Sequence, residues 1–172
     1  MNSARRLALG LASAPALLIV AALPAHASGS AHFIKSATSA SQSGASVTVS
    51  FKEAGLASGS HETVTVSALA TTAYECVNGG GKNPSASNKH TFNTSISKSG
   101  VFTADKNGNI TGSETLSPPS AASLGFACPS GQAVTFVSVS YTNLKVVDST
   151  SGASTTFSGT FSYANPNAPV VR

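Results

Sequence analysis

Carboxylates are the first side chains to consider for catalysis, and the sequence holds only six of them. Glu53 and Glu75 come first because each lies near the end of an expected strand, Glu53 beside Lys52 and Glu75 beside Cys76. Glycosidase-type hydrolysis needs two carboxyl groups that face each other across a cleft. Because no spacing in the sequence singles out such a pair, we assign no catalytic residue and keep a hydrolase that uses Glu53 or Glu75 as an alternative.

Nucleophilic and metal sites have no stronger support in the sequence. Serine is abundant, with 30 residues, but the GxSxG pattern of a nucleophile elbow is absent. His32, His61 and His90 lie on separate segments, whereas a zinc site usually has two ligands at short spacing. Positions 105–109 resemble the start of a calcium loop, but the Gly and Glu expected at its sixth and twelfth positions are missing. We therefore expect no metal and no cofactor.

A polar loop that follows Cys76 is the best candidate for a contact surface. Its residues are Asn78, Gly79, Gly80, Gly81, Lys82 and Asn83. Surface loops carry many binding functions, although a passive linker would have the same composition. We expect the partner to be an extracellular protein or a cell-surface component.

The first 27 residues have the features of a secretory signal peptide. Arg5 and Arg6 precede an apolar stretch over 7–23, and the small-residue exit Ala25-His26-Ala27 follows. The stretch contains Pro15 and is shorter than the about 20 residues that span a bilayer. We therefore expect cleavage after Ala27, a secreted extracellular protein and no membrane span.

The rest of the chain predicts a single domain over 28–164 and a flexible C-terminal tail over 165–172. The whole sequence has 10 basic and 6 acidic residues among 172. Coiled coils and disordered polyelectrolytes need many more charges than this. Two of the basic residues, Arg5 and Arg6, lie in the leader, so the remaining chain is nearly neutral and has no basic cluster. We therefore expect no nucleic-acid partner.

Cys76 and Cys128 are the only two cysteines. An oxidising compartment favours their pairing, and without a CxxC spacing they form neither a zinc site nor a thioredoxin-like redox motif. We therefore predict one disulfide.

Apolar residues alternate with polar ones over several short segments, which is the pattern of half-buried strands. Seven or more such segments are separated by clusters of Gly, Ser, Asn and Pro, and no helical periodicity lasts beyond one turn. This layout predicts an all-β, immunoglobulin-like antiparallel β-sandwich of about seven to nine strands. We expect most of the eleven Phe and Tyr residues to lie in its core.

Two details of this layout can be tested. The alternating segment 63–76 is long for one strand of a small sandwich, so we expect a bend or a change of sheet near 69–71. Asn107-Gly108 lies between two strand-like segments, which is the strongest short-range signal for a β-hairpin.

Four segments of the chain, taken in order, resemble a family of small exported proteins from actinobacteria. They are Phe51-Lys52-Glu53-Ala54-Gly55-Leu56, Tyr74-Glu75-Cys76-Val77-Asn78-Gly79-Gly80, Cys128-Pro129-Ser130-Gly131-Gln132 and Val139-Ser140-Tyr141-Thr142-Asn143. The likeness covers nearly the whole chain after the leader. This largely uncharacterised family is expected to have an immunoglobulin-like sandwich with one disulfide. The resemblance implies fold and compartment, and it implies no chemistry.

Because no catalytic arrangement has support, we predict a non-enzymatic extracellular domain that acts by binding a protein or a surface. Its neutral, polar β surface offers loops and sheet edges to a partner. A secreted hydrolase and a secreted inhibitor or toxin component are the alternatives.

Overall fold

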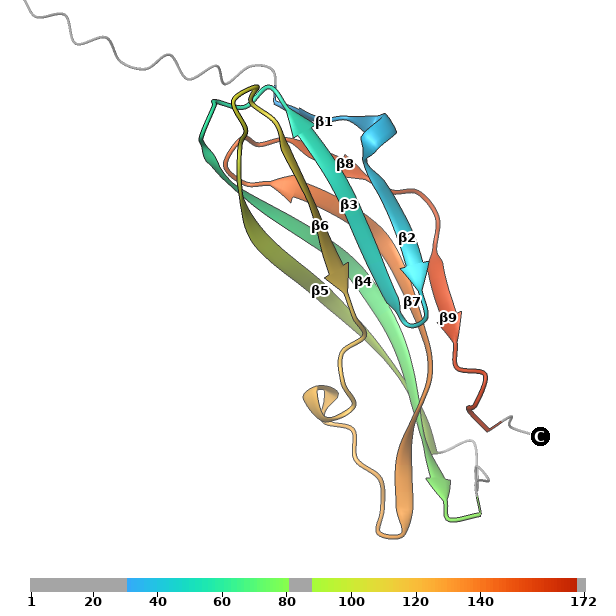
Figure 1. The fold of residues 1–172 in the computed structure, drawn as a ribbon. Helices are drawn as coiled ribbons and strands as arrows, with labels where there is room; N and C mark the ends of the chain where they lie inside the picture. Colours follow the sequence, from blue (N-terminus) through green and yellow to red (C-terminus); the bar gives the residue numbers. More distant parts are fainter. Residues whose placement is uncertain (1–30, 81–87, 170–172) are drawn as a thin grey trace, which may run out of the picture.

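Nine strands form two antiparallel sheets in the residues that the computed structural model describes, 31–80 and 88–169 (Figure 1). These residues also contain two short 3-10 helices, η1 (Lys35–Ala37) and η3 (Ala122–Leu124), and no α-helix. The predicted all-β fold, its two antiparallel layers and its strand number are therefore confirmed. The predicted leader over 1–27 lies outside the described residues.

The smaller sheet has four strands built around β3 (Ser46–Ala54). On one edge β3 pairs with β6 (Ile110–Leu116). On its other edge it pairs with β1 (His32–Phe33) near one end and with β2 (Ser39–Ser43) near the other.

The larger sheet has five strands and is built around β4 (His61–Asn78). Its neighbours are β5 (Lys89–Thr103) and β7 (Gln132–Asp148). The far edge of β7 pairs with two short strands, β8 (Ser154–Thr156) and β9 (Phe161–Ala164).

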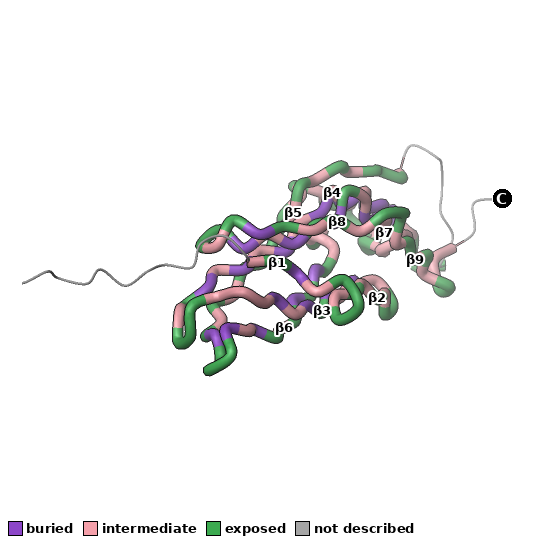
Figure 2. The backbone as a smooth tube through the Cα atoms, turned by 90° about the horizontal axis from the view of Figure 1, so that it is seen from above, coloured by how far each residue is buried: buried purple, intermediate pink, exposed green. Residues whose placement is uncertain are grey.

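The main core lies between the two sheets and is built from alternate residues of each strand. Buried positions concentrate where the two layers face each other (Figure 2). The central strands contribute branched and aromatic side chains that are at most 2 % exposed: Val47, Val49, Phe51, Val64, Val66, Val139, Tyr141, Leu144 and Val146. Each such side chain stabilises the fold by about 1.5–3 kcal/mol relative to an exposed one.

The two sheets differ in length. The strands β4, β5 and β7 have 18, 15 and 17 residues, whereas β3 and β6 have 9 and 7. At one end of the molecule the five-stranded sheet therefore continues beyond the four-stranded sheet (Figure 1). Residues 117–131, which connect β6 to β7 and which we call the crossing segment, lie beside this extension.

Of the expected bend or change of sheet near 69–71, the change of sheet does not occur, because β4 is one continuous strand. Its pairing register with β7 shifts between Ser67 and Leu69, and again between Ala73 and Tyr74. These irregularities increase the local twist, so a long strand stays in one sheet without changing layer.

The predicted hairpin around Asn107-Gly108 is only half right. The turn is present: the Asp105 carboxylate accepts hydrogen bonds from the backbone N–H groups of Asn107 and Asn109, and Gly108 has a φ of 71°. The flanking strands do not pair with each other, because β5 pairs with β4 and β6 pairs with β3. The turn therefore carries the chain from one sheet to the other.

Changing Tyr141 to Phe tests one link between the two layers. The Tyr141 hydroxyl lies in the core and donates a 2.6 Å hydrogen bond to the carbonyl oxygen of Ala45, in the turn between β2 and β3. Its loss leaves that carbonyl unpaired, so we expect a loss of about 1 kcal/mol in the free energy of unfolding and a decrease in Tm of a few degrees. Thermal unfolding followed by circular dichroism measures this.

The control is Tyr163→Phe, because the Tyr163 hydroxyl makes no hydrogen bond to the described residues. An equal Tm for wild type and both variants would contradict the role assigned to the Tyr141 hydroxyl.

Candidate functional site

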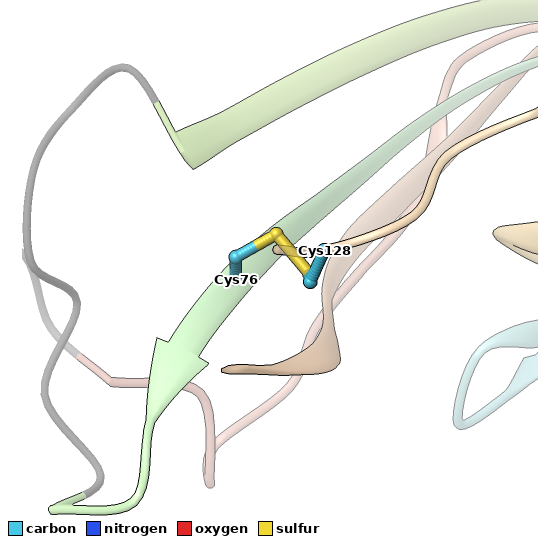
Figure 3. The surroundings of a disulfide bond; sticks show 2 residues. All are labelled: Cys76 and Cys128. Atoms are coloured by element: carbon cyan, nitrogen blue, oxygen red, sulfur yellow. A yellow bond between two sulfur atoms is a disulfide. The ribbon is translucent and has the colours of Figure 1, made fainter. Parts of the chain in front are cut away.

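The predicted disulfide is present and joins the far end of β4 to the crossing segment (Figure 3). Cys76 and Cys128 are separated by 52 positions in sequence, and their Cα atoms are 5.6 Å apart. The bond holds the crossing segment against the part of β4 that the smaller sheet does not cover.

Two further contacts fix the crossing segment on the larger sheet. The Tyr74 hydroxyl donates a 2.7 Å hydrogen bond to the carbonyl oxygen of Pro119. The ring of Phe126 lies against three rings of the sheet, with centroid distances of 6.2 Å to Tyr74, 5.9 Å to Phe92 and 5.1 Å to His90. The crossing segment forms no strand of its own. It is therefore held on the larger sheet by a hydrogen bond, by ring contacts and by the disulfide.

These rings belong to a group that we call the aromatic cluster. Its members are Tyr74, His90, Phe92, Phe126, Phe136 and Tyr163. The pairings Tyr74 with His90 and Tyr74 with Phe136 place side chains of β4, β5 and β7 on one face of the sheet. That face is the inner one, because Tyr74 has the same alternation as the core residues Val64 and Val66.

The aromatic cluster is only partly covered. Tyr74 is buried, with 7 % of its surface exposed, whereas Phe92, Phe126, Phe136 and Tyr163 are half-buried and His90 is exposed. Val134, which pairs with Cys76 on the same face, is 42 % exposed. Most of the Phe and Tyr residues do lie in the main core or pack against it, as expected, and Phe136 and Tyr163 are among them. The expectation misses Tyr74, Phe92 and Phe126, which gather outside that core where the smaller sheet ends.

The predicted contact loop begins beside the aromatic cluster and the disulfide. Asn78, Gly79 and Gly80 are exposed, and the Asn78 side-chain oxygen accepts a hydrogen bond from the backbone N–H of Gly80. Gly81, Lys82 and Asn83 lie outside the described residues.

The two carboxylates singled out in the sequence lie far apart. Glu75 is near the disulfide end of β4, whereas Glu53 lies at the opposite end of the sandwich beside Glu62. Glu62 and Glu75 are thirteen residues apart along β4, which at about 3.3 Å per residue is roughly 40 Å. Both Glu53 and Glu75 are fully buried, so they do not flank a common cleft.

The structure instead brings Glu53 together with Glu62 and Asp148, a group that we call the carboxyl cluster. The three residues come from β3, β4 and β7 and are 0 %, 3 % and 0 % exposed. In each carboxyl one oxygen accepts a hydrogen bond: from the Ser151 hydroxyl for Glu53, from the Ser60 hydroxyl for Glu62 and from the Thr150 backbone N–H for Asp148.

The remaining oxygens of the carboxyl cluster meet other carboxyl oxygens. The Glu53 and Glu62 carboxyls lie near that of Asp148, and this neighbour raises the pKa of both glutamates. Among the described residues no donor group reaches Glu53 Oε2, Glu62 Oε2 or Asp148 Oδ2. Because an ionised carboxylate only accepts hydrogen bonds, these buried oxygens can pair with one another only where a carboxyl is protonated.

Burial is the main cause of the raised pKa values of Glu53 and Glu62 in the carboxyl cluster. It raises the pKa of Glu53 to about 7; the Ser151 hydroxyl acts in the opposite direction, and the nearby Asp148 and Glu62 raise the pKa further. Burial also raises the pKa of Glu62, against the hydrogen bond from Ser60 and with a further increase from Asp148.

The sequence does contain a signal for the carboxyl cluster, namely the inward-facing alternation of the strands. Comparing the spacings between carboxylates does not detect this signal. Each acid continues an inward-facing alternation by two positions: Glu53 follows Phe51, Glu62 precedes Val64, and Asp148 follows Val146. Period-two alternation therefore places all three side chains inside the sandwich. Their meeting at one end depends on the pairing of strands that are distant in sequence.

In residues 31–80 and 88–169, no group of three or more His, Cys, Asp or Glu side chains has an arrangement that could hold a metal ion. This statement covers the carboxyl cluster and the histidines His32, His61 and His90.

Comparisons with known protein families, with curated proteins and with solved structures find no match to this chain. The likeness to exported actinobacterial proteins stays a prediction. No helix of the described residues is long and apolar enough to cross a membrane.

The carboxyl cluster predicts that the protein becomes less stable as the pH rises from about 4.5 to about 7. Over this range the unfolded chain has released the Glu53 proton and the folded protein still binds it, so the free energy of unfolding falls with pH. The fall amounts to up to about 3 kcal/mol. Urea unfolding at a series of pH values measures it.

In Glu53→Gln the amide replaces the protonated carboxyl, so we expect a flatter pH dependence than in wild type. The control is Asp105→Asn, because the exposed Asp105 has a pKa lowered by the backbone N–H groups of its turn and stays ionised throughout this range. Equal pH dependences for wild type and Glu53→Gln would show that Glu53 does not hold the proton.

Removal of the disulfide should destabilise the end of the molecule that contains the aromatic cluster and the crossing segment more than the rest. For Cys76→Ala/Cys128→Ala we expect the free energy of unfolding to fall by about 4 kcal/mol, because the unfolded chain regains the freedom of the closed loop. Amide hydrogen exchange should accelerate most in the crossing segment. Unchanged exchange there would contradict the anchoring role of the bond.

Proposed function

We propose that this chain works outside the cell as a non-enzymatic binding domain. Its contact surface is the exposed side of the aromatic cluster, extended by Val134 and by the start of the loop at Asn78. The observation that carries the proposal is the incomplete cover of these rings on a face that elsewhere forms the core.

The chemistry of this surface suits a partner with apolar groups. Aromatic side chains supply large contact area, and they are enriched where proteins meet partners. The disulfide and the Tyr74 hydrogen bond to Pro119 hold the surface in place before binding, which reduces the entropy lost on association.

An extracellular location has support from the disulfide, because such bonds persist in oxidising compartments. The expected signal peptide over 1–27 and the likeness to exported actinobacterial proteins agree with this location. Two packed antiparallel sheets are also consistent with an immunoglobulin-like sandwich, which we propose as the finer description of the fold.

The hydrolase alternative has no comparable support. Glu53 and Glu75 are both buried, and they lie at opposite ends of the sandwich. A raised carboxyl pKa, as in the carboxyl cluster, is also typical of an acid catalyst. The carboxyls of this cluster are buried, however, so a substrate cannot reach them.

Phe126→Ser tests the contact surface. With envelope fragments and culture-fluid proteins of the producing organism as probes, we expect the labelled wild-type protein to bind and the variant to bind at least about tenfold more weakly, because central aromatic residues carry much of a binding energy. His90→Ala, at an exposed position, should weaken binding without affecting the fold.

The matched control is Val101→Ser, which removes the other large exposed apolar side chain, 68 % exposed and outside the aromatic cluster. Binding that is lost in Val101→Ser and kept in Phe126→Ser and His90→Ala would overturn the proposed surface. Competition by soluble polysaccharides would distinguish a carbohydrate partner from a protein.

A further inference from the structure

The strand β5 forms one edge of the five-stranded sheet. It pairs with β4 over fifteen residues, from Lys89 with Glu75 to Thr103 with His61, without a shift in register. No strand of the described residues pairs with its other side, and it lies at the border of the sheet in Figure 1. A row of backbone N–H and C=O groups on this side is therefore open to another strand.

The other sheet edges offer much less backbone to an incoming strand. On the opposite edge of the same sheet, β8 and β9 have three and four residues. In the smaller sheet, the edge strands β1, β2 and β6 have two, five and seven residues. Short edge strands are a common protection against unwanted pairing, and β5 lacks this protection.

Of the other common protections of an edge, β5 has one, the inward-facing Lys98. It contains no proline and, within the described residues, no bulge against β4. Its charged residues are Lys89 at one end and Lys98, whose Nζ lies 3.3 Å from a carboxylate oxygen of Glu114. Val101, on the outward-facing row, is the most exposed large apolar side chain of the described residues, at 68 %.

We propose that β5 pairs with β5 of a second copy of the chain, antiparallel and about a two-fold axis at Ile96. This inference goes beyond the proposed binding function and involves a different surface. When all fifteen residues pair, each residue of one copy opposes the residue at the same distance on the other side of Ile96. The two five-stranded sheets then form one continuous sheet, and the interface is closed and self-complementary.

This register avoids every like-charge contact across the edge. Lys98 opposes Thr94 of the partner copy, and Lys89 opposes Thr103. Like charges directly opposite each other would destabilise the pair. A shift that placed Lys98 against itself would bring the two ammonium groups together, so charge favours the full overlap.

The same register opposes small polar residues on the outer face, Ser95 with Ser97 and Asn93 with Ser99. On the inner face Phe92 opposes Gly100, which the Phe102 ring and the Glu114 carboxylate of its own chain already cover. His90 opposes Phe102, and Val101 opposes the hydroxyl-bearing Thr91. A strand that can oppose its own copy along its whole length without a like-charge contact is the reason to assign a second copy as the occupant.

Analytical ultracentrifugation of the purified, oxidised protein tests the proposal. We expect a concentration-dependent dimer for wild type and a monomer for Ser95→Lys/Ser97→Lys. Both serines are exposed on the outer face, and residue 95 opposes residue 97 of the partner, so the variant creates two like-charge pairs. The matched control is Ser95→Lys/Ser97→Glu, which creates two opposite-charge pairs at the same positions and should stay dimeric.

Cysteine cross-linking tests the register. A mixture of the separate variants Ser95→Cys and Ser97→Cys should form a covalent heterodimer, because directly opposed residues are close enough for a disulfide. Each variant alone should form far less, because its cysteines are then diagonal neighbours about 7–8 Å apart.

A monomeric wild-type protein at all concentrations would overturn the proposal. So would a dimer that persists in Ser95→Lys/Ser97→Lys, because it would have to use another surface. Pairing of β5 with an extended segment of a different protein, with the wild type monomeric alone, would also overturn it.

Discussion

The unequal length of the two sheets is the constraint on which the rest of this structure depends. The strands β4, β5 and β7 continue beyond the smaller sheet, so part of an inner face has no opposing sheet to cover it. Apolar surface of this kind must be covered by something else or stay available for binding. Here the crossing segment covers Tyr74, and the disulfide fixes that segment in place, while the neighbouring rings stay partly exposed.

Local rules predicted much of this fold. The alternation over Val47, Val49 and Phe51 identified the inner face of β3, and two cysteines in a chain expected to be exported identified the disulfide. Local rules failed where pairing is set by distant partners. The signal at Asn107-Gly108 correctly predicted a turn, but packing against β4 and β3 decided that the strands on its two sides belong to different sheets.

The same limit applies to the two side-chain clusters. The sequence shows that Glu53 is near a strand end, but its neighbour Asp148 lies almost a hundred residues away and reaches it only through the stacking of two sheets. The aromatic cluster likewise depends on how far one sheet extends beyond the other, which no periodicity encodes. The structure thus places partly exposed aromatic rings at one end and buried acids at the other, with a continuous β4 between them.

The position of the disulfide has a consequence for proteolysis. The bond closes a covalent ring that includes β5, β6 and the turn over 105–109. A protease that cuts at the exposed Lys106 of this turn therefore produces two fragments that remain attached through sulfur. Such a cleavage would nick the molecule without releasing a piece of it, and both halves would separate only after reduction.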